Sequence, residues 1–261
     1  MRKFNAFVQV NPLLIYTGLG FAVLSLLLII LIPFNEIEVL GINSVYKPLK
    51  FSLSIWLYCW TMALLLSFFV DKSLVRRIAI IGVIVMVFEQ LVITAQAFRG
   101  ELSHFNETDP MGIVLFSLMG LMITWNTIEV LRGALKFRKQ IDEIDPALKA
   151  GIYWGLMIIV VGSFIGGYMG YLRSHQIGGP MGEAGLALLN WSVNYGDVRV
   201  SHFIGLHALQ ILPLFAWLLI KNNTNHKNLS LLVHIFALFY LSIVMVTLIQ
   251  AILGHSVVFW K

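Results

Sequence analysis

Cysteine and charge are both scarce in this sequence. Cys59 is the only cysteine among 261 residues, which excludes an intramolecular disulfide and a thiolate-rich metal site. Charged residues make up 12% of the chain and hydrophobic residues 59%, whereas soluble domains carry about 25% charged residues. A chain with so little charge is expected in lipid, and the lipid bilayer is therefore its first predicted partner.

Long hydrophobic runs dominate the sequence instead. Seven of them are long enough to cross a hydrocarbon core of ~30 Å as a helix. They cover residues 13–34, 51–70, 78–98, 111–131, 151–172, 203–220 and 229–253. No linker or shift in composition divides the chain, so the sequence predicts a single seven-span transmembrane domain over residues 1–261, an all-α polytopic membrane helix bundle.

The basic residues predict how this bundle is oriented. Twelve of the eighteen fall on the side of the N-terminus: Arg2, Lys3, Lys72, Arg76, Arg77, Arg132, Lys136, Arg138, Lys139, Lys149, Lys221 and Lys227. The other six fall on the opposite side: Lys47, Lys50, Arg99, Arg173, Arg199 and Lys261. Because basic residues favour cytoplasmic loops, the N-terminus is predicted to be cytoplasmic and the C-terminus external. The net charge of +5 is then a topology signal, and we expect no nucleic-acid partner.

Glu89 is the most informative single residue, because it lies within the apolar run 78–98. A carboxylate at the centre of a membrane helix costs about 2.5–3.5 kcal/mol on insertion scales, so a functional role is the default expectation. Glu89 is nine residues before Phe98 and His207 is eight residues after Arg199, which places each about 12–13 Å below the external surface. The matching depth predicts that Glu89 and His207 meet, as catalytic acid and base or as a proton relay.

The remaining polar residues are expected to line one cavity open to the external side. The candidates for orienting a small-molecule or lipid substrate are Arg99, Arg199, Gln96, Gln210 and Gln250. The candidate metal ligands are His104, His202, His207 and Asp197, types that suit zinc, iron or copper. A haem could instead be bound by His207, with His202 or His104 nearby. His202 and His207 are, however, about 140° apart around a helix, so one undistorted helix cannot aim both at one metal.

Three functions remain open at this point. The first is a metal or haem site that acts on a lipid-soluble or small substrate. The second is a transporter or channel with Glu89 as its proton or ion relay, and the third is a subunit or sensor that docks a partner through its external loops. Separately, Gly162, Gly166 and Gly170 form small-xxx-small steps that predict close helix packing, three times more often within one chain than between two copies of a homo-oligomer.

Three segments carry a resemblance to a known family. They read Lys-Pro-x-Lys-Phe from residue 47, Gln-Ala-x-Arg-Gly-x-x-Ser-His-Phe-Asn from residue 96, and Gly-Asp-x-Arg-x-x-His-Phe-x-Gly-x-His-Ala-Leu-Gln from residue 196. With these motifs the chain resembles a family of bacterial multispanning membrane proteins that has no assigned activity. The resemblance implies a multi-pass protein of the bacterial cytoplasmic membrane, and it draws attention to the same external polar residues without naming a reaction.

Overall fold

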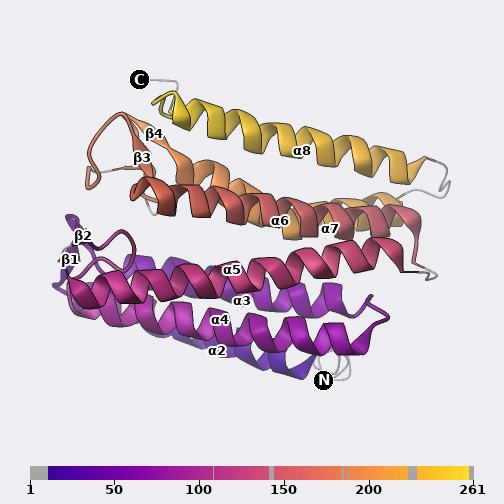
Figure 1. Ribbon diagram of the computed structural model, residues 1–261, viewed down its shortest axis with the longest axis horizontal. Helices are drawn as coiled ribbons and strands as arrows, with labels where there is room; N and C mark the ends of the chain where they lie inside the picture. Colours follow the sequence, from indigo (N-terminus) through magenta and orange to yellow (C-terminus); the bar gives the residue numbers. More distant parts are fainter. Residues whose placement is uncertain are drawn as a thin grey trace. The chain divides into compact units, whose positions relative to one another are not determined.

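Seven long helices account for most of the part of the chain that the computed structural model describes, residues 11–107, 109–140, 144–183, 185–187, 189–222 and 228–258 (Figure 1). They are α2 (Pro12–Leu31), α3 (Tyr46–Leu66), α4 (Lys72–Phe98), α5 (Pro110–Lys139), α6 (Pro146–Leu172), α7 (Val198–Asn222) and α8 (Leu229–Ile252). All seven are long and apolar enough to cross a membrane. The all-α, multi-pass membrane fold predicted from the hydrophobic runs is thus confirmed.

Several of these helices extend past the hydrophobic runs that predicted them. Helix α4 begins at Lys72, six residues before the apolar run, and α5 continues through the basic residues Arg138 and Lys139. Helix α3 begins at Tyr46, so Lys47 lies in its first turn and not in a flanking loop. Hydropathy marks only the part of a helix that lies in hydrocarbon, whereas the hydrogen-bonded turns continue into the polar interface.

Short polar side chains mark where many of the helices begin. Asn11, Asp71 and Asp145 each accept a hydrogen bond from a backbone N–H in the first turn of α2, α4 and α6. Asp109 does the same for α5 through the N–H groups of Met111 and Gly112, at 3.2 and 3.1 Å. Such caps satisfy donors that would otherwise have no partner at a helix end.

The chain divides into two compact units with a boundary inside α5, and each is described by itself. Unit 1 extends to Glu129 and contains α2, α3, α4 and the larger part of α5. Helices α2, α3 and α4 lie side by side within it (Figure 1). Trp60 of α3 packs over Gly18 of α2 and donates a hydrogen bond from Nε1 to the Ile15 carbonyl at 3.2 Å. A short hairpin lies between α2 and α3. Its two antiparallel strands, β1 (Glu38–Val39) and β2 (Ile42–Asn43), have two residues each.

Unit 2 begins at Val130 and is built around the contact between α6 and α7. Gly162 and Gly205 face each other there so closely that a Cβ on Gly162 would lie 2.8 Å from the backbone of Gly205. Gly166 lies against the ring of His202 in the same contact. The close packing predicted from the glycine stripe therefore occurs inside one copy of the chain, and at Gly162 and Gly166 that face is not available for a homo-oligomer.

A small platform lies at the end of unit 2 where α7 begins. Strands β3 (Gln176–Ile177) and β4 (Gly196–Asp197) pair in antiparallel fashion directly before α7. Gly196 lies against the Ala251 carbonyl near the end of α8, where no side chain would fit. Its position fixes β4, and with it the first residues of α7, against α8.

Candidate functional site

Three buried polar side chains, Glu89, Gln90 and Gln96, lie on the C-terminal half of α4 in unit 1. A hydrogen bond shows which part of α3 lies beside them. Nε2 of Gln90 donates to the Pro48 carbonyl at 3.1 Å. Pro48 belongs to the first turn of α3. Glu89 is therefore level with the N-terminal end of α3, although on α4 two and a half turns follow it.

Lys47 links Glu89 to the loop between α4 and α5. Its ammonium acts electrostatically on the Glu89 carboxylate, and its Nζ lies 3.2 Å from Nδ1 of His104. The same Nδ1 is 3.2 Å from Oγ of Ser103. Since an ammonium can only donate, Nδ1 of His104 is the acceptor in its contact with Lys47. Lys47 thus interacts both with the carboxylate of Glu89 on α4 and with the imidazole of His104 in the loop.

Glu89 has hydrogen-bonding capacity that the described residues do not use. The residue is only 6% exposed. Its Oε1 is buried and has no hydrogen-bond partner among the residues that the structure describes. The neighbouring Gln90 Oε1 is in the same condition within that part of the chain. A buried acceptor without a donor costs about 1–3 kcal/mol, so these oxygens are suited to a proton, water or a ligand donor.

Aromatic rings surround His104 on its other sides. The ring centroids of Phe51 and Phe116 lie 5.9 and 5.7 Å from that of His104, and Phe105 follows at 6.1 Å. Phe105 has a positive φ of 62°, which turns the chain back towards α5. The imidazole is therefore held by packing as well as by Lys47.

Arg99, predicted to bind an anionic substrate group, is used within the protein. It donates to Oε1 of Gln96 at 2.8 Å and contacts Oδ2 of Asp109 at 3.4 Å. Gln96 donates in turn to the Leu102 carbonyl at 3.3 Å. Both predicted substrate residues thus fasten the loop to the end of α4, and neither contacts Glu89.

A second group of polar side chains lies beside the N-terminal half of α4 in unit 1. Oη of Tyr58 donates to Oδ1 of Asn126 at 3.2 Å, and both atoms lie beside Gly82 of α4. One turn along α5, the fully buried Glu129 pairs with Arg77 at 2.7 Å. Gly82 and Glu89 are seven residues apart, so they share one face of α4 with a separation of about 10 Å.

In unit 2, the predicted ligand Asp197 forms an ion pair with Arg199. Nη2 of Arg199 lies 2.6 Å from Oδ2 of Asp197, and Nε lies 2.9 Å from Oδ1. Asp197 also accepts from the backbone N–H of Ser192 at 2.8 Å, and Arg199 donates to the Asn190 carbonyl. This buried, two-point pair holds together the platform at the start of α7.

His202 is likewise used in packing. Its Nδ1 lies 2.7 Å from the carbonyl oxygen of Gly162, and the ring fills the notch above Gly166. Gln250, another predicted substrate residue, donates from Nε2 to the Ser256 carbonyl directly after α8.

His207 lies on a different face of α7. Its ring is 4.2 Å from that of Phe203, one turn earlier on the same helix. Phe203, Ile211 and Leu214 of the same stripe are exposed. Because Glu89 belongs to unit 1 and His207 to unit 2, the predicted meeting of the two stays a prediction.

The predicted metal site is not supported. Among the residues that the structure describes, no three His, Cys, Asp or Glu side chains gather closely enough to hold a metal ion. Of the four predicted ligands, Asp197 is committed to Arg199, His202 to Gly162 and His104 to Lys47.

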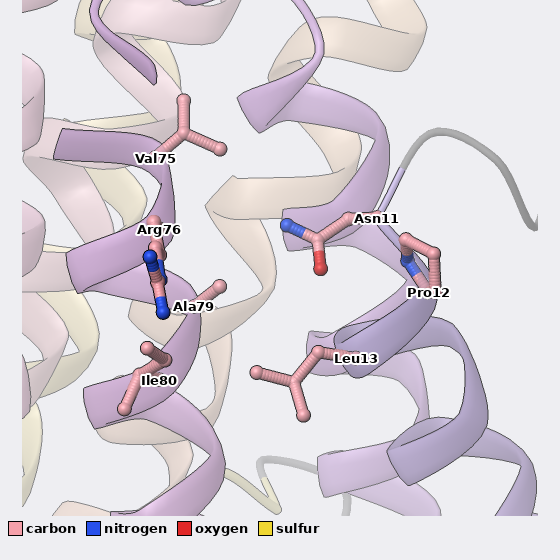
Figure 2. Close-up of a pocket in the computed structure, with 7 residues that line it drawn as sticks. All are labelled: Asn11, Pro12, Leu13, Val75, Arg76, Ala79 and Ile80. Carbon is pink, nitrogen blue, oxygen red and sulfur yellow. The ribbon is translucent and has the colours of Figure 1, made fainter. Parts of the chain in front are cut away.

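A cavity of about 500 Å³ lies in unit 1 between the first residues of α2 and α4 (Figure 2). Arg76 lines it and precedes Glu89 by thirteen residues, or about 20 Å along α4. The cavity and the Glu89 cluster are therefore separate features at opposite ends of that helix.

Comparison with known proteins adds no relative to this description. No family model, curated protein or solved structure matches the chain. Its function therefore has to be argued from the sites themselves.

Proposed function

We propose that the chain is a multi-pass protein of a bacterial cytoplasmic membrane, with its N-terminus in the cytoplasm and its C-terminus outside. The orientation is supported by the twelve basic residues on the N-terminal side against six on the other. The bacterial setting is supported by the resemblance of the three motif segments. In this orientation Glu89, Lys47 and His104 belong to the external half of unit 1.

We further propose that the protein is a membrane transporter or channel that conducts protons, with Glu89 as the proton relay. The observation that carries this proposal is the buried Glu89 carboxylate, with one oxygen that has no donor among the described residues and with Lys47 leading from it to His104. Ionisable residues within membrane spans mark proton or ion pathways in many proteins.

The arrangement suggests how the external step proceeds. While Glu89 is ionised, the Lys47 ammonium balances its charge. When a proton from the external side reaches Glu89, the carboxylate becomes neutral and its attraction for Lys47 disappears. Lys47 still has Nδ1 of His104 as an acceptor, so its charge is not left without a partner.

The second polar group, around Tyr58 and Asn126, favours a transporter or channel over an enzyme. Tyr58, Asn126, Glu129 and Arg77 form this second polar group, which begins beside Gly82 and extends towards the cytoplasmic end of unit 1. About 10 Å of α4 separates Glu89 from this group, a gap that water has to bridge. A transporter requires polar groups on both sides of such a gap, whereas an enzyme site open to the external side requires only the outer ones.

The test is proton flux into liposomes that contain the purified protein, driven by a potassium diffusion potential and followed with an internal pH dye. We expect Glu89→Gln to reduce the flux to that of empty liposomes. Glu107→Gln is the matched control, because Glu107 is an exposed carboxylate of the external loop, and it is expected to retain the flux.

Two results would overturn the proposal. One is an equal flux in wild type and Glu89→Gln. The other is a visible haem absorption band or a stoichiometric metal ion that disappears in His207→Ala, with no proton flux in the wild type, which would favour a haem or metal site instead.

A further inference from the structure

The cavity at the start of α2 and α4 is a second feature with recognisable binding chemistry. Asn11, Pro12 and Leu13 line it from α2, and Val75, Arg76, Ala79 and Ile80 line it from α4. Figure 2 shows Asn11 and Leu13 facing Val75 and Ala79 across the space. Its volume of about 500 Å³ falls in the range of ~300–1,000 Å³ typical of sites for small molecules.

Arg76 supplies a positive charge that none of the described residues neutralises. The next residue, Arg77, is paired with Glu129 at 2.7 Å. Arg76 is exposed and has no hydrogen-bond or ion-pair partner among the residues that the structure describes. On the other side of the cavity, Oδ1 of Asn11 accepts from the Leu14 N–H at 3.3 Å, which leaves its Nδ2 as a donor for a ligand.

The walls change from polar to apolar with depth. Asn11 directly precedes α2, and Arg76 is four residues into α4, about 6 Å from its start. Ala79 and Ile80 lie one turn further into the membrane, and Leu13 and Ile80 are 44% and 37% exposed. Donors at the membrane boundary above an apolar wall match a lipid, whose headgroup lies above its acyl chains.

We propose that this cavity binds an anionic phospholipid of the cytoplasmic leaflet, with its phosphate at Arg76 and Asn11 and an acyl chain along Leu13, Ala79 and Ile80. A basic side chain at the membrane surface attracts anionic lipids, and a guanidinium suits a phosphate because it can donate two parallel hydrogen bonds. The proposal rests on the orientation of the chain and not on its proton transport, so either can fail without the other.

Native mass spectrometry of the detergent-purified, delipidated protein tests this directly, with phosphatidylglycerol and phosphatidylcholine titrated separately. We expect the wild type to bind phosphatidylglycerol more tightly than phosphatidylcholine. Arg76→Gln should weaken phosphatidylglycerol binding about fivefold, the effect of one basic residue near anionic lipid. Ile80→Trp should also weaken it by filling the acyl wall, and neither change should affect folding, because both side chains are exposed.

Lys221→Gln is the matched control. Lys221 lies in the last turn of α7, over the ring of Trp217 and outside the cavity, and its loss should leave the binding unchanged. Equal binding of the two lipids to the wild type would overturn the proposal, and so would equal losses in Arg76→Gln and Lys221→Gln. Lipid binding that appears only after residues 1–10 are deleted would also overturn it, because the chain itself would then occupy the cavity.

Discussion

Nζ of Lys47 lies 3.2 Å from Nδ1 of His104, which connects the first turn of α3 to the loop between α4 and α5. The same ammonium also acts electrostatically on the carboxylate of Glu89, which belongs to α4. One lysine thus serves both the buried carboxylate and the imidazole. This sharing has consequences for stability as well as for proton movement.

Lys47→Met is expected to destabilise the protein by about 2–3 kcal/mol, because it leaves an ionised Glu89 in the membrane without its counter-charge. Glu89→Gln combined with Lys47→Met should recover most of that loss, since no charge then remains. Thermal unfolding of the two single variants and the double variant in detergent measures the coupling. Additive losses in the double variant would show that the two side chains do not interact.

Tyr58→Phe is expected to slow proton flux while leaving the fold intact. The substitution removes only the hydroxyl that donates to Asn126 at 3.2 Å, and it keeps the buried ring. In the liposome assay we expect a rate at least tenfold below wild type, since a positioned proton-transfer group contributes about 10²–10⁴-fold in other systems. A rate equal to wild type would place the second polar group outside the proton path.

Gly162→Ala is expected to destabilise unit 2 by about 1–3 kcal/mol, the usual range for overpacking. Its new methyl group would lie 2.8 Å from the Gly205 backbone, which cannot move without separating α6 from α7. Gly167→Ala on the same helix is the control, because a Cβ there meets nothing within 4 Å. We expect it to be neutral or slightly stabilising, as alanine favours helix more than glycine does. Similar thermal shifts for both variants would contradict the packing.

Asp197→Asn is expected to cost about 3–5 kcal/mol, because it leaves Arg199 with half of a buried ion pair. Asp109→Asn removes the same charge from the more exposed pair with Arg99, and we expect a change of at most about 1 kcal/mol, since asparagine also caps helices well. Thermal unfolding of the two variants compares a buried pair with an exposed one. Equal losses would show that burial does not set the energy of these pairs.

Much of the fold could be predicted because hydrophobic runs of membrane length have few other structures available to them. The contact of Gly162 and Gly166 with α7 could also be anticipated from small-residue spacing. The sites were harder, because helix rise gives the depth of a side chain but not its partner. Arg99 and Arg199 looked like substrate residues, yet their partners Asp109 and Asp197 are ten and two residues away in the chain.

Two contributors to the candidate site were missed or misplaced by the sequence. Lys47 was expected to flank its span, and only the earlier start of α3 places it in the first turn, at the level of Glu89. Tyr58 lies among apolar residues and gave no signal, because its role depends on Asn126, 68 residues further along the chain. Contacts of this kind come from tertiary packing, which local periodicity does not report.

Infrared difference spectroscopy after a step in external pH measures whether Glu89 exchanges a proton with the external side, as we propose. In wild type, a step to lower pH should produce the carbonyl stretch of a protonated carboxylic acid, and the band should be absent in Glu89→Gln and retained in Glu107→Gln. A band that persists in Glu89→Gln, or that never appears in wild type, would contradict the account.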